Sequence, residues 1–468
     1  MISHESELYY LTIKEASKLI REHRLSPVEL TEAFLNRIDR LDAKLQSYIT
    51  VLPENALSEA KDAESDIMNG IYKGDLHGIP IALKDLYDTR NIRTTASSRV
   101  MKDRIPSEDA TTTSRLKSAG AILLGKLSMH EFALGGPDHT CGFPLARNPW
   151  NIDHGPSGSS SGSGVATAAG LCMGSLGSCT GGSIRGPASI CGIVGLKPTY
   201  GRVSRYGVIP LSWTLDHCGP MTWTVEDTAI MLQAISGYDP KDPTSSKVSV
   251  PNYSDSLTED LKGVRIGIPK HFFFADDPRI DSETLKIVGL AIETLQDLGA
   301  IIQEITIPSL EYIGHAQRVI MLSEAFTYHK RNLSQRPNDF GEMVREWFRM
   351  GALYSASDYI QSQRLRKSLQ DEFAHIFKKV DLIASPTMSQ PAPRFDEIEL
   401  MSTVKMLSFT SPYNMSGMPA ISVPCGFTTS GLPVGLQLAA RPFDEPTIIR
   451  ASYTYQQKTR LFDKRPPI

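Results

Sequence analysis

Two short segments rich in serine and glycine are the part of this sequence best suited to acyl-transfer chemistry. Residues 157–164 contain only Ser and Gly, and the cluster Thr-Gly-Gly-Ser follows at 180–183. A serine hydroxyl can attack a carbonyl carbon, and glycines allow successive backbone N–H groups to converge on the oxyanion that forms. Residues 165–169, Val-Ala-Thr-Ala-Ala, favour a helix directly after the first segment, so we expect an ordered loop there rather than a flexible linker.

A serine nucleophile also needs a base, and Lys84 is a candidate for that role. It ends the apolar run 79–83, Ile-Pro-Ile-Ala-Leu, which has the composition of a buried strand. Charging a lysine in an apolar setting costs free energy, so such a lysine can be neutral enough to accept a proton. Most lysines are simply solvated, and the residues alone leave both interpretations open.

Two other motifs compete with this interpretation. The run 120–126, Gly-Ala-Ile-Leu-Leu-Gly-Lys, begins like a phosphate-binding P-loop, but Leu127 stands where Ser or Thr should reach the magnesium ion, and we reject it. Residues 158–162 match the G-x-S-x-G nucleophile elbow, which would make Ser160 the nucleophile. The residues before the elbow, 151–156, do not form the strand that it requires.

The motifs together resemble the amidase signature family of serine hydrolases. The matching segments cover nearly the whole chain: Lys84-Asp85, Gly125-Lys126, 148–150, 156–163, 180–185, 191–201, 216–220, 417–420 and 435–437. The resemblance implies an α/β fold, with a single large domain over residues 1–468 in which helices flank a central mixed β-sheet. We expect residues 1–70 to pack on this domain as a helical segment.

The same resemblance implies the roles of individual residues. Ser183 would be the nucleophile, Ser159 the bridging serine, whose peptide bond is cis in the family, and Lys84 the base. No metal ion and no organic cofactor would take part. The oxyanion and the substrate would be bound by the backbone N–H groups of Thr180, Gly181, Gly182 and Ser183.

At two positions the chain departs from the family pattern. Cys179 stands where family members usually have Asp before the Thr-Gly-Gly-Ser cluster, and Ser157 stands where the preceding loop usually begins with Gly. The first change removes an anion that would support Arg185 and the loop. We expect Cys179 to fill the space as a packing residue, and a second nucleophile is the alternative.

The family includes free-standing amidases and the A subunit of the glutamine-dependent aminoacyl-tRNA amidotransferase. The run 134–140, Leu-Gly-Gly-Pro-Asp-His-Thr, lacks the residues expected of that subunit. We therefore expect a free-standing amidohydrolase that cleaves the C–N bond of a small organic carboxamide. Arg366 and Asp444 fall where the subunit contacts glutamine, so that subunit stays the alternative. A non-catalytic binding module is a third interpretation, and the intact triad argues against it.

Composition limits the partners that we expect. The 49 basic and 52 acidic residues give a net charge of −3, so the basic footprint of a nucleic-acid-binding protein is missing. No apolar stretch approaches the roughly 20 residues that span a bilayer, and the acidic N-terminus resembles no secretory signal. We expect a cytoplasmic enzyme with a small-molecule amide substrate, no nucleic-acid or membrane partner, and scope for a homodimer. The six cysteines show no CxxC pair and are predicted to be reduced core thiols.

Local patterns predict the elements that must hold these loops. Thr12 with Glu15 and Ser26 with Glu29 both fit the capping box, and Pro27 suits the first position of a helix, so the first sixty or so residues are predicted to be helical.

From about residue 78 the pattern alternates between strands and helices. The runs predicted as strands are 79–83, 121–124, 264–268, 301–307, 382–384, 420–423 and 433–438, and amphipathic helices are predicted at 282–298 and 445–459. This alternation indicates an α/β fold with a largely buried sheet.

Overall fold

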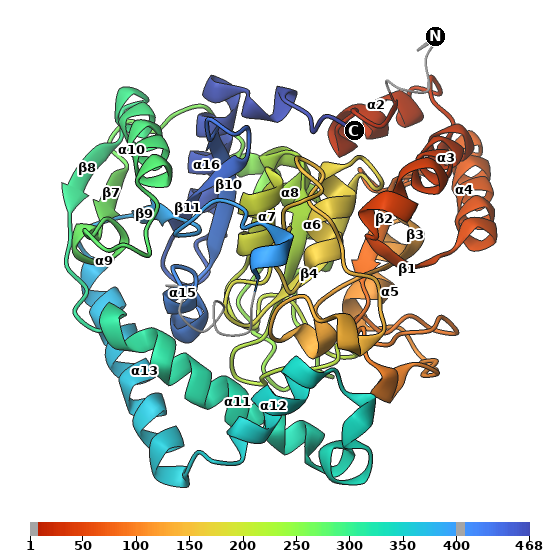
Figure 1. Ribbon diagram of the computed structural model, residues 1–468. Helices are drawn as coiled ribbons and strands as arrows, with labels where there is room; N and C mark the ends of the chain where they lie inside the picture. The colour runs from red at the N-terminus through yellow and green to blue at the C-terminus, as the bar shows by residue number, and fades with distance from the viewer. Residues whose placement is uncertain (1–7, 399–407) are drawn as a thin grey trace.

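One large mixed sheet runs through the protein, and helices flank it (Figure 1). The computed structural model describes residues 8–398 and 408–468. Its eleven strands lie in the order β1-β3-β2-β4-β6-β5-β10-β11-β9-β7-β8. The strands are β1 (Tyr48–Val51), β2 (Pro80–Lys84), β3 (Ile122–Leu127), β4 (Gly174–Cys179), β5 (Val194–Lys197), β6 (His217–Thr222), β7 (Arg265–Ile268), β8 (Ile301–Glu304), β9 (Leu382–Pro386), β10 (Ala420–Phe427) and β11 (Pro433–Ala439).

The helices form the outer layers of this α/β fold. They are α2 (Ile13–Arg21), α3 (Pro27–Leu45), α4 (Pro53–Met68), α5 (Thr111–Ser118), α6 (Ser161–Ala168), α7 (Arg185–Cys191), α8 (Val225–Ile235), α9 (Lys270–Phe273), α10 (Ser282–Asp297), α11 (Leu310–Gln335), α12 (Glu342–Gly351), α13 (Ala356–Ile376), α15 (Ser411–Ser416) and α16 (Glu445–Thr459). In Figure 1, α3 and α4 lie beside the β1–β3 edge, α10 lies beside β7 and β8, and α11 to α13 lie together at the lower side.

The strand directions place the ends of two parallel strands together. β2 lies between β3 and β4 and is parallel to both, whereas β4 is antiparallel to β6 on its other side. Parallel neighbours have their carboxyl ends at the same edge of the sheet, which is where α/β proteins commonly bind ligands. The segments that follow β2 and β4 therefore meet at one edge.

The N-terminal segment is less uniformly helical than its sequence predicts. The Thr12–Glu15 capping box is present at α2, and Ser26 caps α3 by accepting from the N–H groups of residues 28 and 29. However, Tyr48–Val51 forms β1 and pairs antiparallel with β3. This run, Tyr-Ile-Thr-Val, consists of aromatic and β-branched residues, which favour a pleated strand over a helix.

The predicted strands and the two predicted helices are present, with boundaries that shift by a few residues at most. Three inner strands were not predicted: β4, β5 and β6. The sequences of β4 (Gly-Ser-Leu-Gly-Ser-Cys) and β6 (His-Cys-Gly-Pro-Met-Thr) do not alternate and contain only one β-branched residue, Thr222, yet every residue in them is buried. They are strands because neighbouring strands pair with them on both sides.

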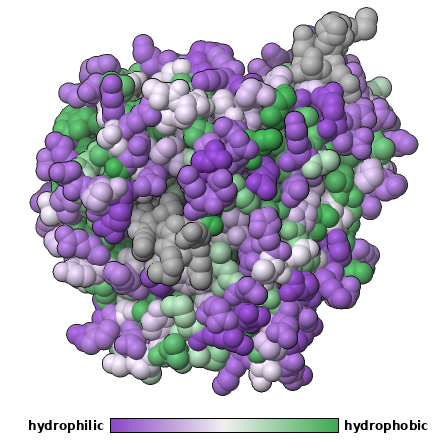
Figure 2. All heavy atoms as spheres, viewed as in Figure 1, coloured by the Kyte–Doolittle hydropathy of each residue, from purple (hydrophilic) through white to green (hydrophobic). Residues whose placement is uncertain are grey.

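Surface and core divide as in an ordinary folded protein. On the face shown in Figure 2, hydrophilic side chains predominate, and hydrophobic ones are scattered between them.

All six cysteines are buried and unpaired, as predicted. Within residues 8–398 and 408–468, no helix has the length and apolar character needed to cross a membrane.

Candidate active site

Lys84 ends β2 and is completely buried at the edge where β2 and β4 finish. Its Nζ lies 2.8 Å from Ser159 Oγ, 3.0 Å from Ser160 Oγ and 2.9 Å from Ser178 Oγ. Ser178 belongs to β4, and the other two serines belong to the Ser/Gly segment 157–164. The structure therefore brings the predicted base and the predicted bridging serine into direct contact.

The surroundings of Lys84 favour its neutral form. Three serine hydroxyls surround the amine, and no carboxylate in the described part of the chain forms an ion pair with it. Burial disfavours the charged form, and it lowers the pKa of Lys84 from the ordinary value to about 7. A large fraction of Lys84 is thus unprotonated near neutral pH and can accept a proton.

Ser159 lies two residues before α6, where the first Ser/Gly segment becomes helical. The peptide bond between Gly158 and Ser159 is cis, as the family resemblance implied. The Ser159 side chain is nearly buried, yet it lines the large cavity described below. Its hydroxyl therefore joins buried Lys84 to a space that a ligand can enter.

Ser160, the serine of the G-x-S-x-G motif, has a different environment. It is completely buried, its Oγ donates to the carbonyl of Ser178 at 3.2 Å, and it does not line the large cavity. The residues before it form no strand. Ser160 therefore does not fit a nucleophile elbow, because its hydroxyl does not reach the cavity and no strand precedes it.

Ser183 lies in the loop between β4 and α7, half-buried, and lines the same cavity as Ser159. Two distant residues hold the carbonyl groups of this loop. Gln317 Nε2 donates to the Thr180 carbonyl at 2.8 Å, and Thr410 Oγ1 donates to the Gly181 carbonyl at 2.5 Å. The protein itself therefore engages both of these carbonyl groups.

Glycine is required at position 182. Its φ of +153° is one that L side chains rarely adopt, and an added Cβ would lie 2.1 Å from Thr410 Oγ1. The backbone N–H groups of residues 181–183 have no acceptor among the described residues. This loop therefore offers adjacent donors, as an oxyanion site needs.

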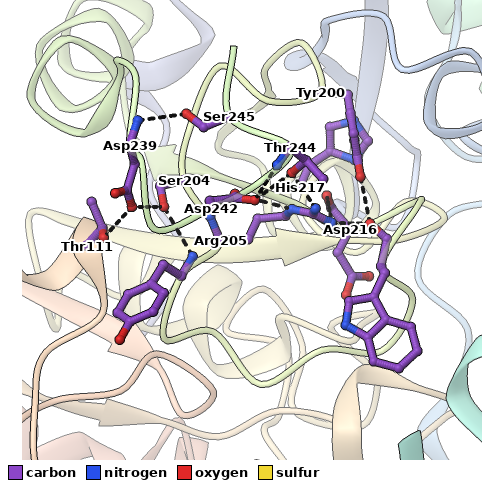
Figure 3. Close-up of polar contacts among 12 residues, drawn as sticks. Thr111, Tyr200, Ser204, Arg205, Asp216, His217, Asp239, Asp242, Thr244 and Ser245 are labelled. Atoms are coloured by element: carbon purple, nitrogen blue, oxygen red, sulfur yellow. Dashed lines mark hydrogen bonds and ion pairs between the residues drawn. The ribbon is translucent and has the colours of Figure 1, made fainter. Parts of the chain in front are cut away.

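A polar network fixes the Thr180 side chain from the opposite side. Thr180 Oγ1 donates to Asp216 Oδ1 at 2.6 Å, and Asp216 Oδ2 accepts from two backbone N–H groups at 2.8 and 2.9 Å. Burial raises the pKa of Asp216, while these hydrogen bonds act in the opposite direction. Beside Asp216, Arg205 donates to Thr244 Oγ1 and lies 3.7 Å from Asp242 (Figure 3). These two contacts connect the network to the loop that contains Asp242 and Thr244.

Arg185 is fully buried and has no carboxylate partner among the described residues. It donates to Gln437 Oε1 at 2.6 Å, to Asn414 Oδ1 at 2.5 Å and to the carbonyl of Thr410 at 3.1 Å. Its Nη2 also lies 3.7 Å from Cys179 Sγ. Neutral amide and carbonyl oxygens thus replace the anion that the resemblance led us to expect.

Cys179 is completely buried beneath the Thr180–Ser183 loop. Burial favours the neutral thiol, but the nearby charges of Arg185 and Lys197 outweigh it and lower the pKa of Cys179. Asn414 Oδ1 lies 3.5 Å from its sulfur. Complete burial favours the packing role that we expect for Cys179.

The large cavity has a volume of about 810 Å³, and its floor carries Ser159, Thr180, Gly181 and Ser183. One wall is a face of α11, which includes Gly314 and Gln317, and α9 and the segment after it contribute another wall. This volume lies in the range of small-molecule sites. The arrangement therefore combines Ser183 and Ser159, which both line the cavity, with Lys84, whose pKa is lowered by burial.

Three other residues that the sequence singled out lie outside the cavity. Arg366 donates to the carbonyls of Met415 at 2.7 Å and Thr214 at 2.8 Å, and Asp444 accepts from Arg441 at 3.0 Å. Lys126 of the rejected P-loop is buried in β3 and donates to two oxygens at 2.7 Å. All three therefore stabilise the scaffold in this structure.

Comparison with known proteins agrees with this geometry. The family model described as Amidase matches residues 29–449, which is most of the chain. The chain belongs to the amidase family. Members of this family act on amide C–N bonds, so an enzyme of that class and its α/β fold are both established for this amidase.

The similarity to individual relatives covers nearly the full length of this amidase. It is 41% identical over 487 residues to the A subunit of the glutamyl-tRNA(Gln) amidotransferase of Moorella thermoacetica, with 99% of each chain covered. It is similar to a solved chain of a vestigial protein complex linked to the origins of an s-triazine catabolic enzyme, with 33% identity, a TM-score of 0.90, and 96% and 99% coverage. It is also similar to the peptide amidase of Stenotrophomonas maltophilia, with 30% identity, a TM-score of 0.85, and 98% coverage of both chains.

The first of these relatives corrects our expectation about partners. That protein is named as one subunit of an enzyme, and the enzyme's name contains a tRNA, so the prediction that nucleic acid plays no part is wrong. The prediction rested on a net charge of −3. Net charge describes one chain as a whole, and it does not report on surfaces that other subunits of an assembly contribute.

Several residues of the site had little or no signal of their own in the sequence. Lys84 contacts Ser178, and Thr180 contacts Asp216 and Gln317. The two residues of each pair lie between 36 and 137 positions apart in the sequence. Asp216 was visible only as part of a matching motif, and Gln317 lies in the middle of an ordinary helix. Tertiary structure alone brings them to the site.

Proposed function

We propose that this amidase is the amide-cleaving A subunit of a glutamine-dependent aminoacyl-tRNA amidotransferase. The observation that carries the proposal is its identity of 41% to such a protein, with 99% of both chains covered. Because the similarity extends from one end of the chain to the other, it includes the strands, helices and loops that shape the cavity. On this proposal the carboxamide of glutamine enters the large cavity, and ammonia leaves.

Acyl transfer would begin with attack by Ser183 on the amide carbonyl. Ser183 Oγ loses its proton to Ser159 Oγ as Ser159 passes its own proton to the neutral Nζ of Lys84, 2.8 Å away. The backbone N–H groups of residues 181–183 would hold the oxyanion. The proton then returns through Ser159 to the departing nitrogen, and water hydrolyses the acyl-enzyme by the same relay.

The low pKa of Lys84, about 7, supports its role as the base. A catalytic base works best when its pKa is close to the working pH, because it is then both unprotonated and sufficiently basic. No histidine is needed in this scheme, as in other Ser–Lys variants of the triad. Burial lowers the pKa of a nearby buried imidazole, His130, to about 4 and leaves it neutral and weakly basic.

The test is the release of ammonia from glutamine. The purified chain is assayed alone and with the other amidotransferase subunits and glutamate-charged tRNA(Gln), and ammonia and amidated tRNA are both measured. The proposal predicts glutamine hydrolysis that disappears in Ser183→Ala and increases with the other subunits and charged tRNA. Absence of both products, from a chain that a fluorophosphonate probe labels at Ser183, would contradict the assignment to this enzyme.

A second candidate is an amidase for another small carboxamide. Arg366 and Asp444, the residues that pointed to glutamine, bind scaffold groups and do not line the cavity. The structural similarity to a peptide amidase supports the same candidate. A panel of aliphatic, aryl and amino-acid amides separates the two functions, since the second predicts a better substrate than glutamine.

A further inference from the structure

The loop between β5 and β6 links helix α11 to the candidate active site. Near its end, Asp216 Oδ2 accepts hydrogen bonds from the backbone N–H groups of Leu211 and Ser212, at 2.8 and 2.9 Å. Asp216 Oδ1 accepts a third from Thr180 Oγ1 at 2.6 Å, and Leu211 lines the large cavity. This part of the loop therefore turns around one carboxylate, which also holds Thr180.

Glu324 of α11 holds the same turn. Its carboxylate is buried and accepts four hydrogen bonds: from Ser212 Oγ at 2.5 Å, from the Thr214 N–H at 3.1 Å, from Thr214 Oγ1 at 2.8 Å and from the Tyr359 hydroxyl at 2.8 Å. From α13, Arg366 donates to the Thr214 carbonyl at 2.8 Å. Two helices at the lower side of Figure 1, α11 and α13, thus fix the turn.

These contacts complete a closed ring of hydrogen bonds that begins and ends on α11. Gln317 of α11 donates to the Thr180 carbonyl at 2.8 Å. Thr180 Oγ1 donates to Asp216, and the Ser212 N–H donates to the same carboxylate. Ser212 Oγ then donates to Glu324. Gln317 and Glu324 are about two helical turns apart, so both lie on one face of α11.

The ring bears on the reaction because Thr180 directly precedes the donors of the oxyanion site. The Thr180 carbonyl and the Gly181 N–H belong to one planar peptide group, so a contact that fixes the carbonyl also fixes the direction of the N–H. Such a donor must point at the oxygen that becomes negative in the transition state. A displacement of about 1 Å can cost about a hundredfold in rate.

We propose that Glu324 is a positioning residue for amide cleavage, because it closes the ring that fixes Thr180 and thereby orients the Gly181 N–H toward the oxyanion. This inference rests on the proposed acyl-enzyme chemistry of Ser183. Glu324 does not line the large cavity, so it acts through the turn at 211–216 and does not touch the substrate. Its loss should lower the rate of the chemical step and leave ground-state binding almost unchanged.

The experiment measures how fast a fluorophosphonate probe labels Ser183. A series of probe concentrations separates kinact, the rate of the chemical step, from KI, which reports the affinity for the probe. Glu324→Leu removes the carboxylate at similar size, so it should lower kinact about tenfold to a hundredfold and keep KI within about twofold.

Glu324→Gln should restore kinact to within about threefold of the native value. Its amide oxygen can take the place of Oε2, which accepts from Ser212 Oγ and the Thr214 N–H. Its NH₂ group can donate to the Thr214 and Tyr359 hydroxyls, which donate to Oε1 in the native protein and are able to accept. A variant that only destabilised the fold would not be rescued in this way.

A matched control lies at the other end of α11. Glu372 accepts from Ser309 Oγ at 2.5 Å, which equals the distance between Ser212 Oγ and Glu324, but it has no part in the ring. Ser212→Ala should lower kinact about threefold to tenfold, whereas Ser309→Ala should keep it within about twofold. Each variant removes a single hydroxyl, so this comparison holds even if Glu324→Leu does not fold.

A double-mutant cycle tests the ring itself. Thr180→Val removes the hydroxyl that binds Asp216 and so opens the ring at its other end. In that background, Ser212→Ala should change kinact by less than about twofold, because contacts within one network are not additive. Losses that multiply in the double variant would show two independent effects and would refute the ring.

The other results that refute the inference concern Glu324 directly. They are a native kinact in Glu324→Leu, a rise in KI as large as the fall in kinact, failure of Glu324→Gln to restore kinact, and equal effects of Ser212→Ala and Ser309→Ala. Failure of the proposed function looks different. Without labelling of Ser183 in the native protein, the acyl-enzyme chemistry is wrong and the inference falls with it. If the native protein is labelled but releases no ammonia from glutamine, only the glutamine assignment fails, and the labelling rates still decide the role of Glu324.

Discussion

The charge state of Lys84 makes the most direct prediction, and it can be tested without knowledge of the substrate. The rate at which a fluorophosphonate probe labels Ser183 should follow the fraction of Lys84 that is neutral, because only the neutral amine accepts the proton. With a pKa of about 7, that fraction is about 1% at pH 5, about 10% at pH 6 and about 90% at pH 8. The labelling rate should rise about tenfold per pH unit below pH 6 and level off above about pH 8.

The sign of this effect follows from burial. Burial destabilises the lysine cation, so the pKa falls and the active neutral form appears at lower pH than for a solvated lysine, whose pKa is about 10.4. A solvated lysine would give a rate that still increases at pH 9. That result would refute the buried, unpaired environment described for Lys84.

Two variants test whether Lys84 is the residue whose titration controls the labelling rate. Lys84→Met keeps the length of the side chain but removes the base, so labelling should become very slow and independent of pH between 5 and 8 within about a factor of two. Burial also raises the pKa of Glu131 to about 7, so Glu131→Gln is the matched control and should retain the pH dependence. An acid limb that persists in Lys84→Met, or is lost in Glu131→Gln, would show that another group titrates.

The remaining predictions concern the loops around Lys84. Ser183→Ala should abolish covalent labelling and Ser160→Ala should preserve it, and a labelled peptide containing Ser160 would revive the nucleophile elbow. Cys179→Ala should keep most of the activity and lower the free energy of unfolding in urea by about 1–2 kcal/mol, since it leaves a small cavity. Buried Cys179 should react slowly with iodoacetamide, and rapid alkylation with matching loss of activity would contradict a packing role. Asp216→Ala should cost about 1–3 kcal/mol of stability and slow the labelling of Ser183, because it leaves the Thr180 hydroxyl and two backbone N–H groups unpaired. A labelling rate unchanged from the native enzyme would exclude that positioning role.

Elements with strong local signals could be predicted from the sequence. The helix at 445–459 is present with those boundaries as α16, and the capping box at Thr12 forms as expected. Periodicity and capping depend on residues only a few positions apart, so the sequence contains all the information needed. The inner strands β4 and β6 could not be found in this way, because their small and polar residues become strand only when neighbours pair on both sides.

For the site, the sequence by itself determined which groups are present. Family motifs predicted roles for Ser183, Ser159 and Lys84, and the residue composition showed that the two serines lie in segments rich in serine and glycine. The identity of the partners could not be predicted from composition, and the expectation based on net charge was wrong. Sequence motifs report what chemistry is available, because they consist of residue types at short spacing.

Tertiary structure alone decided how those groups behave. It buries Lys84 among three serine hydroxyls without an ion pair to any of the residues that the structure describes, and that environment, rather than the residue type, lowers the pKa to about 7. It also separates Ser159, which faces the cavity, from its neighbour Ser160, which does not. Desolvation and access depend on atoms from strands and helices far apart in the chain, and no local pattern of residues contains that information.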